Sequence, residues 1–243
     1  MRIFIINLVN ETERLSAVTS QCANNDLAYE VISAIDGRKM PQTLLSAIVD
    51  SYESSALTKG EIGCALSHLS VYAAMKRDNI PLALILEDDA VLSPSIRDYL
   101  AGAKEILSTK VPAIVLLTGN CSYNRFIKKT DSFGHPFHRV INGSGGHGYV
   151  INLAAAKRLL LANMPVRLEA DRWTIFRDLI GLTIWCCDSP VIKSSCTAPG
   201  TSTIGSEREL VAKARGRAIN KLKKTVSLYQ LKRIKNMLLS KVG

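Results

Sequence analysis

Three consecutive acidic residues, Glu87, Asp88 and Asp89, follow an apolar run from Leu82 to Leu86 without a break. Adjacent carboxylates repel one another, so proteins keep them together where a hard cation or a polar ligand balances their charge. If the strand continued through them, Glu87 and Asp89 would face one way and Asp88 the other. We therefore predict that Glu87 and Asp89 share one divalent ion with a bound phosphate group. A solvated acidic turn would have the same composition.

Two histidines, His68 and His147, lie in sequence surroundings that are compatible with ligand binding. His68 lies in a predicted helix that begins near Thr58 and Glu61, where it could contact a ligand, hold Glu61 or serve the fold alone. His147 lies among glycines, which let the backbone approach a ligand closely or form a turn. Both imidazoles are candidate ligand contacts.

Apolar strands alternate with amphipathic helices around these groups. The predicted strands are residues 2–8, 27–34, 82–86, 113–117, 148–151, 183–186 and 191–193, and the predicted helices lie within 10–18, 58–76, 94–107 and 154–161. The run 82–86 is apolar throughout, which is typical of a central strand covered on both faces. Ligand sites in such sheets lie at the carboxyl ends of the strands. We predict an α/β fold with a mostly parallel central sheet.

The composition indicates a folded domain with a basic appendage. The 243 residues are 47% hydrophobic and 21% charged, which excludes disordered and fibrous classes. The formal net charge is +10, but residues 207–243 hold 11 basic and 2 acidic residues, which leaves +1 for residues 1–206. We predict a domain over 1–206 and a tail over 207–243, separated by turn-forming residues at 198–203. We expect no nucleic-acid binding, because the tail's single aromatic residue, Tyr229, offers no stacking platform.

The tail has the pattern of basic amphipathic helices. Its apolar residues form two stripes at spacings of three and four, namely Val211, Ala214, Ala218, Leu222, Val226 and Tyr229, then Leu231, Ile234, Leu238 and Val242. Such helices bind anionic membranes, although a terminal helix packed on the domain has the same pattern. No apolar run approaches the roughly 20 residues of a membrane span, and the N-terminus lacks signal-peptide features. We expect a cytoplasmic protein, peripheral on the inner face of the cytoplasmic membrane.

Five motifs occur between residue 2 and about residue 205 in an order that a known family shares. They are Ile5-Ile6-Asn7-Leu8 with Arg14 downstream, Ser33-Ala34-Ile35-Asp36-Gly37, the runs 57–69 and 83–90, and Gly146-His147-Gly148-Tyr149-Val150-Ile151. Together they resemble glycosyltransferase family 25, the bacterial lipooligosaccharide galactosyltransferases that are related to collagen galactosyltransferase domains. Five separated motifs in the right order are far harder to match by chance than one.

The resemblance implies a GT-A-like nucleotide-sugar transferase fold and an inverting transfer of a hexose, with galactose preferred, from a UDP-sugar. The implied acceptor is a lipid-linked glycan of lipooligosaccharide or lipopolysaccharide. The implied metal is Mn²⁺ or Mg²⁺ at Glu87 and Asp89, where Glu replaces the first Asp of a D-x-D element. The implied donor-binding residues are Asn7, Arg14, Asp36, Glu61, Ser67, His68, Asp88 and His147. Arg14 could instead pair with Glu11 on its own helix.

Inverting transfer needs one general base to take the proton of the acceptor hydroxyl. The family's Pro-x-Asp element is displaced here. If Pro165 is its proline, its aspartate matches Asp171 only when residues are inserted between the two. We expect Asp171 or Glu169 to be the base, since the acidic triplet would be occupied by metal. Asp171 could instead be a helix-terminal charge or pair with Arg172.

Two alternatives fit the same sequence. A transferase of this family could use UDP-glucose or a UDP-N-acetylhexosamine, and no residue pattern distinguishes these donors. A non-catalytic nucleotide- or glycan-binding protein could retain the fold. The intact triplet at Glu87 argues against this second alternative, because loss of catalysis would release the acidic residues from selection first.

Overall fold

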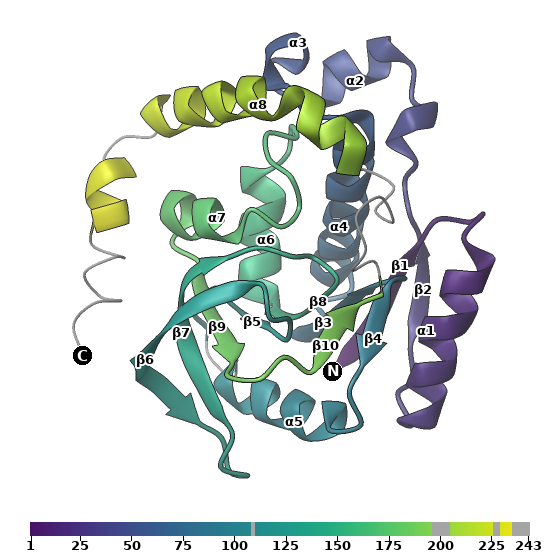
Figure 1. Cartoon of the computed structure of the whole chain (residues 1–243), viewed down its shortest axis with the longest axis vertical. Coiled ribbons are helices and arrows are strands. Elements are labelled where there is room, and N and C mark those ends of the chain that lie inside the picture. Colours follow the sequence, from purple (N-terminus) through teal and green to yellow (C-terminus); the bar gives the residue numbers. More distant parts are fainter. Residues whose placement is uncertain (108–109, 196–204, 226–228, 235–243) are drawn as a thin grey trace.

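An eight-stranded sheet in the order β2-β1-β3-β8-β5-β9-β7-β6 organises the chain (Figure 1). The computed structural model describes residues 1–107, 110–195, 205–225 and 229–234. The strands of this sheet are β1 (Arg2–Asn7), β2 (Glu30–Ser33), β3 (Leu82–Glu87), β5 (Ala113–Leu116), β6 (Cys121–Thr130), β7 (Pro136–Gly143), β8 (Gly148–Asn152) and β9 (Thr183–Cys187). A small antiparallel pair joins β4 (Ala90–Leu92) to β10 (Ile192–Ser194).

Most strands of the large sheet run in one direction. β1 is parallel to β2 and β3, and β5 is parallel to β9. β8 lies antiparallel between β3 and β5, and β7 lies antiparallel between β9 and β6. β7 and β8 are therefore the two reversed strands, and the predicted α/β class with a mostly parallel central sheet is confirmed.

Helices cover both faces of the sheet. They are α1 (Thr12–Asn24), α2 (Gln42–Ile48), α3 (Tyr52–Ser55), α4 (Lys59–Arg77), α5 (Ile96–Ile106), α6 (Leu153–Ala162), α7 (Trp173–Ile180) and α8 (Gly205–Thr225), with a short 3₁₀ helix η1 (Gly37–Lys39). One apolar core joins α4, α6 and α7 to one face, and a second core joins α1 and α5 to the other. The fully buried Leu84, Ile85 and Leu86 of β3 reach both cores, as a central strand requires.

The start of α4 is fixed by the capping box that the sequence predicts. Thr58 Oγ1 accepts the Glu61 N–H at 3.1 Å, and the Glu61 carboxylate accepts the Thr58 N–H at 2.9 Å. A Cβ on Gly63 would collide with the backbone of Ile35 and Gly37, so only glycine lets α4 pack against the segment that follows β2. This close approach places one face of α4 beside the carboxyl ends of β1, β2 and β3.

Helix α8 packs on the domain. Arg215 and Ile219 of α8 are buried, and Ile219 belongs to the core that contains α4, α6 and α7. Figure 1 shows α8 crossing beside α3 at one end of the molecule. Its outer side carries exposed basic residues, namely Lys213, Arg217, Lys221 and Lys224. The predicted stripe residues Val226, Leu238 and Val242 lie outside the described residues. The helices that the structure describes include none long and apolar enough to cross a bilayer.

Candidate active site

A pocket of about 660 Å³, partly open to solvent, lies at the carboxyl ends of β1, β2 and β3. It is formed by Ile6 and Leu8 at the end of β1, by residues 34–38 after β2, by Glu87 and Asp88 at the end of β3, by Arg14 of α1, and by Gly60, Cys64, Ser67 and His68 of α4. The predicted donor-binding residues that line it are Arg14, Asp36, Ser67, His68 and Asp88. The fold thus brings together five residues from four separate sequence motifs.

The acidic triplet forms a turn, with Arg14 beside it. β3 ends at Glu87, and Asp88 and Asp89 lie in the turn before β4. Arg14 Nη2 lies 2.7 Å from Asp88 Oδ1 and 3.9 Å from Asp89 Oδ2, so Arg14 pairs with the triplet rather than with Glu11. The expectation that Glu87 and Asp89 share a strand face is wrong, because the alternation of a strand does not continue into a turn.

The donor atoms of this turn suit a divalent cation. Asp89 Oδ1 is buried and finds no hydrogen-bond partner among the described residues. Burial raises the pKa of Asp88 to about 6 even though Arg14 opposes the rise, and the charges of Asp89 and Glu87 add to it. Asp88 and Asp89 share one guanidinium, which leaves negative charge uncompensated that a hard cation with oxygen ligands would balance. Asp88 and Asp89 therefore fit a divalent cation as a pair of oxygen ligands, whereas the set of three ligand atoms that converges among the described residues is Cys64, His68 and Glu87.

Glu87 is held by a buried chain of hydrogen bonds. His68 Nε2 lies 3.2 Å from Glu87 Oε1, and His68 Nδ1 lies 2.8 Å from the Tyr149 hydroxyl, which is 2.5 Å from the Tyr72 hydroxyl. All three contacts are satisfied when Tyr72 donates to Tyr149, Tyr149 to His68 and His68 to Glu87. Burial raises the pKa of Glu87, but His68, His147 and Arg14 together bring it below its ordinary value. Glu87 is therefore ionised at neutral pH while it accepts the hydrogen bond from His68.

A second possible set of metal ligands shares His68 and Glu87 with these hydrogen bonds. Cys64, His68 and Glu87 each offer one atom within 4.8 Å of the others. Thiolate and imidazole favour softer ions than a set of carboxylates does. Since His68 already bonds Glu87, the acidic turn is the better place for Mg²⁺ or Mn²⁺.

A glycine loop connects the pocket to Asp171. A Cβ on Gly146 would collide with Glu87 Oε1, and the His147 carbonyl accepts the Glu87 N–H at 3.3 Å. The Gly145 N–H donates to Asp171 Oδ2 at 2.9 Å, while the Gly145 carbonyl accepts Trp173 Nε1–H at 2.9 Å. One loop therefore contacts both the acidic turn and the candidate base.

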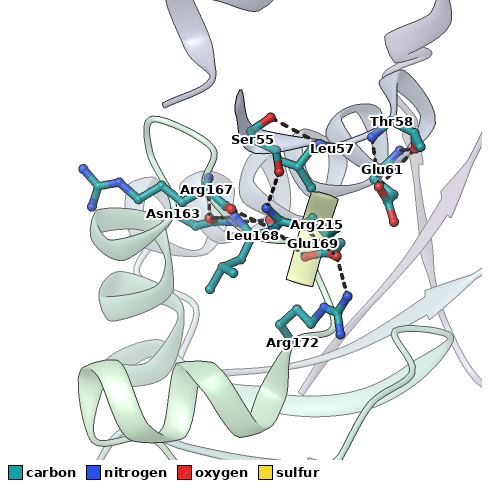
Figure 2. Close-up of polar contacts among 10 residues, drawn as sticks. All are labelled: Ser55, Leu57, Thr58, Glu61, Asn163, Arg167, Leu168, Glu169, Arg172 and Arg215. Carbon is teal, nitrogen blue, oxygen red and sulfur yellow. Dashed lines mark hydrogen bonds and ion pairs between the residues drawn. The ribbon is translucent and has the colours of Figure 1, made fainter. Parts of the chain in front are cut away.

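The other candidate base is locked in ion pairs (Figure 2). Glu169 is buried, and its carboxylate accepts hydrogen bonds from Arg215 at 2.7 and 3.1 Å and from Arg172 at 2.6 Å. Burial alone would raise the pKa of Glu169, but the two guanidinium groups lower it to about 2. A carboxylate this acidic is a poor proton acceptor at neutral pH, which corrects the expectation that Glu169 could serve as the base.

Two further predictions need comment. Glu61 does not line the pocket, because its carboxylate caps α4 and faces the side where Glu169 and Arg172 lie, so its expected contact with the donor is wrong. Asn7 lies between the lining residues Ile6 and Leu8, and its buried Oδ1 meets no hydrogen-bond partner in the described part of the chain. An unsatisfied buried oxygen beside a pocket is a suitable contact for a ligand N–H or O–H.

A family model described as glycosyltransferase family 25 (LPS biosynthesis protein) matches residues 1–174. The chain belongs to glycosyltransferase family 25. The match includes the pocket, the acidic turn, the glycine loop and Asp171.

Several of the similar proteins come from animals. Procollagen galactosyltransferase 1 of Danio rerio is 24% identical over 172 residues, which cover 66% of this chain and 28% of that protein. A glycosyltransferase 25 family member of Drosophila melanogaster is 29% identical over 172 residues, with the same coverage. Inactive glycosyltransferase 25 family member 3 of Homo sapiens is 28% identical over 175 residues, which cover 68% of this chain and 29% of that protein. The matches thus span less than a third of the length of these relatives.

Some residues of this family 25 site escape sequence reasoning. Tyr72 fits an apolar helix stripe and Tyr149 an apolar strand, yet their hydroxyls support His68 and Glu87. The available signal is chemical, because a tyrosine hydroxyl on a buried position needs a hydrogen-bond partner. Cys64 and Arg38 also line the pocket without a distinguishing pattern.

Proposed function

We propose that this chain transfers a hexose, with galactose preferred, from a UDP-sugar to a glycan of the lipooligosaccharide or lipopolysaccharide type, with inversion at the anomeric carbon. The main observation in support is that Asp89 Oδ1 is buried without a hydrogen-bond partner among the described residues. Asp89 belongs to the acidic turn at the edge of the pocket that Arg14 lines. The family supports a sugar transfer, and the name of the Danio rerio relative supports galactose.

The proposed chemistry assigns each residue a role. Asp88 and Asp89, with Glu87 at the strand end, would hold Mn²⁺ or Mg²⁺, which supplies positive charge for a diphosphate leaving group. Arg14 lies beside the same carboxylates and adds a second positive charge for the diphosphate. Asp171 takes the proton of the acceptor hydroxyl. The hydroxyl oxygen bonds to the anomeric carbon from the face opposite UDP, and the bond to the UDP oxygen breaks.

Replacing Asp89 by Asn should weaken the binding of UDP in the presence of Mn²⁺, because the buried oxygen loses its charge. We expect the affinity to fall on the order of 10-fold or more, the scale of a lost charge-assisted contact in a partly buried site. Calorimetry with UDP and Mn²⁺ measures this. Asp26→Asn, at an exposed carboxylate paired with Arg97, is the matched control.

Unchanged metal-dependent affinity in Asp89→Asn would refute the metal assignment. Hydrolysis of a panel of UDP-sugars, with and without Mn²⁺, then identifies the donor. UDP binding without hydrolysis or transfer of any sugar would favour the non-catalytic alternative, a state that the name of the Homo sapiens relative describes for that protein.

The basic side of α8 supports a second part of the proposal, that the enzyme works at the inner face of the cytoplasmic membrane on a lipid-linked acceptor. Lys213, Lys221 and Lys224 are exposed, while Arg215 and Ile219 hold the helix on the domain. Each basic residue near an anionic surface adds about 1 kcal/mol of attraction. Removing the helix would also remove buried contacts, so the charges alone must be changed.

A variant with Gln at Lys213, Lys221 and Lys224 should bind phosphatidylserine vesicles roughly 100-fold more weakly, since three charges are lost at about 1 kcal/mol each. Vesicle sedimentation measures this, and salt should weaken binding of the unmodified protein through screening. Vesicles of phosphatidylcholine are the control. Equal binding of the variant and the unmodified protein to anionic vesicles would contradict the membrane proposal.

A further inference from the structure

A second cleft lies between α8 and the starts of α4 and α7. Its volume is about 620 Å³, part of it open to solvent, and it has charged and apolar sides. The domain contributes Glu61, Glu169 and Arg172, and α8 contributes Val211, Gly216 and Ile219. Figure 2 shows Glu169 and Arg172 together, with Glu61 on the neighbouring helix. The functional roles proposed above leave this cleft unused.

The cleft adjoins the donor pocket across α4. Gly60 and Cys64 of α4 line the donor pocket, whereas Glu61, next to Gly60, lines the second cleft. The two cavities therefore share the first turns of one helix as a wall.

The candidate base belongs to the segment that lines the second cleft. Asp171 is flanked by Arg172 and, two residues earlier, by Glu169, and both of these line the second cleft. The Asp171 carboxylate itself accepts the N–H of Gly145, in the loop that contacts Glu87. A molecule in the second cleft would thus contact the segment that carries Asp171, next to the candidate base.

The lining has the chemistry of a saccharide site. Saccharide hydroxyls bond to carboxylates and guanidinium groups, while their C–H faces pack on apolar side chains. Arg172 uses Nη2 to bond Glu169, and 42% of its side chain remains exposed. Val211 and Ile219 supply apolar surface on the α8 side.

We infer that this cleft binds the acceptor saccharide and that α8 forms its outer wall. The inference rests on the proposed function, because only a glycosyltransferase has an acceptor. It gives residues 205–225 a part in the reaction that differs from membrane attachment.

Gly216 offers a direct test. A Cβ built on Gly216 meets no atom within 4 Å among the described residues, so a larger side chain has room and would extend into the cleft. Glycine inside a helix is less favourable than most other residues, so the replacement should not destabilise α8. A loss of transfer could then be assigned to the filled cleft rather than to unfolding.

The experiment compares Gly216→Phe with Arg217→Phe, which places the same ring on the exposed neighbour that borders a different cleft beside α3. The acceptor probe is a pool of core oligosaccharides released from lipooligosaccharide by mild acid, with the UDP-sugar that the donor panel identifies. We measure transfer kinetics, UDP binding and the melting temperature. Gly216→Phe should raise the KM for the oligosaccharides at least 10-fold, with UDP affinity within twofold and no fall in melting temperature. Arg217→Phe should change none of these.

Two failures are distinguishable. If the unmodified protein transfers sugar and folded Gly216→Phe transfers with the same KM, the cleft is not the acceptor site. If the unmodified protein neither binds UDP nor transfers to the pool, the proposed function itself is wrong. A parallel loss of UDP affinity in Gly216→Phe would also overturn the inference, because the cleft would then serve the donor.

Discussion

Asp171→Asn should lower the rate of transfer on the order of 100-fold or more while UDP affinity stays within about twofold, the pattern of a lost general base. The asparagine oxygen can still accept the Gly145 N–H that Asp171 accepts at 2.9 Å, so the loop keeps its support. The variant therefore removes the proton acceptor and little else. Steady-state kinetics with saturating donor, together with calorimetry of UDP, separate the two effects.

Asp50→Asn is the control for this prediction. Asp50 is an exposed carboxylate that pairs with Arg167 at 2.8 Å, and its loss should leave the rate within about twofold. Glu169→Gln tests the alternative that Glu169 is the base. If Glu169→Gln loses turnover with intact UDP binding and Asp171→Asn does not, the base is Glu169, and the ion pairs around it must open during the reaction.

Arg215→Met should cost about 3–5 kcal/mol of folding free energy, because removal of one partner leaves the Glu169 charge buried without its main counterion. Arg215 also donates to the carbonyls of Ser55 at 2.8 Å and Arg167 at 2.9 Å, so one guanidinium connects three segments (Figure 2). Urea unfolding measures the loss. Arg217→Met, at an exposed neighbour, should change the unfolding free energy by less than about 0.5 kcal/mol.

The ion pair also predicts a pH dependence of stability. The pKa of Glu169 is about 2 in the folded protein and about 4.5 as an ordinary glutamate, so the folded state favours the ionised form. The stabilisation is complete above about pH 5 and is lost as the pH falls toward 2, which amounts to about 3 kcal/mol. Glu169→Gln should flatten the unfolding free energy in this window. An equally steep acid loss in Glu169→Gln would assign the dependence to other carboxylates.

The sequence predicts the parts of the fold whose patterns are local. Thr58 and Glu61 determine the start of α4 by capping, and the apolar run at 82–86 identifies the central strand. The hairpin of β6 and β7 is not predicted, because β6 is a mostly exposed edge strand whose pairing shifts register twice. An exposed strand does not need alternating apolar and polar residues, and a bulge interrupts that alternation where it occurs, so the sequence of β6 lacks the pattern by which strands are predicted.

The sequence predicts many of the residues that form the site, but not which residues they contact. Arg14, Ser67 and Asp88 line one pocket as expected, because α1 and α4 pack beside the strand end that Asp88 follows. The role of Glu169 depends on Arg215, which lies 46 residues further along the chain and resembles the ten other basic residues of the tail. The spacing of residues in the sequence does not reveal a pairing between such distant positions. The sequence alone therefore cannot distinguish the buried Arg215 from the solvent-exposed basic residues around it.

The position of Arg215 has a consequence for the order of synthesis. Domains fold from the N-terminus as the chain emerges, and the loop with Glu169 and Asp171 emerges before α8 does. Until α8 docks, Glu169 has Arg172 as its nearest counterion, and the proposed acceptor cleft has no outer wall. Fragments that end before residue 215, whether from premature termination or proteolysis, should therefore keep the donor pocket but lack a functional acceptor side. The enzyme would acquire activity only once α8 has been made.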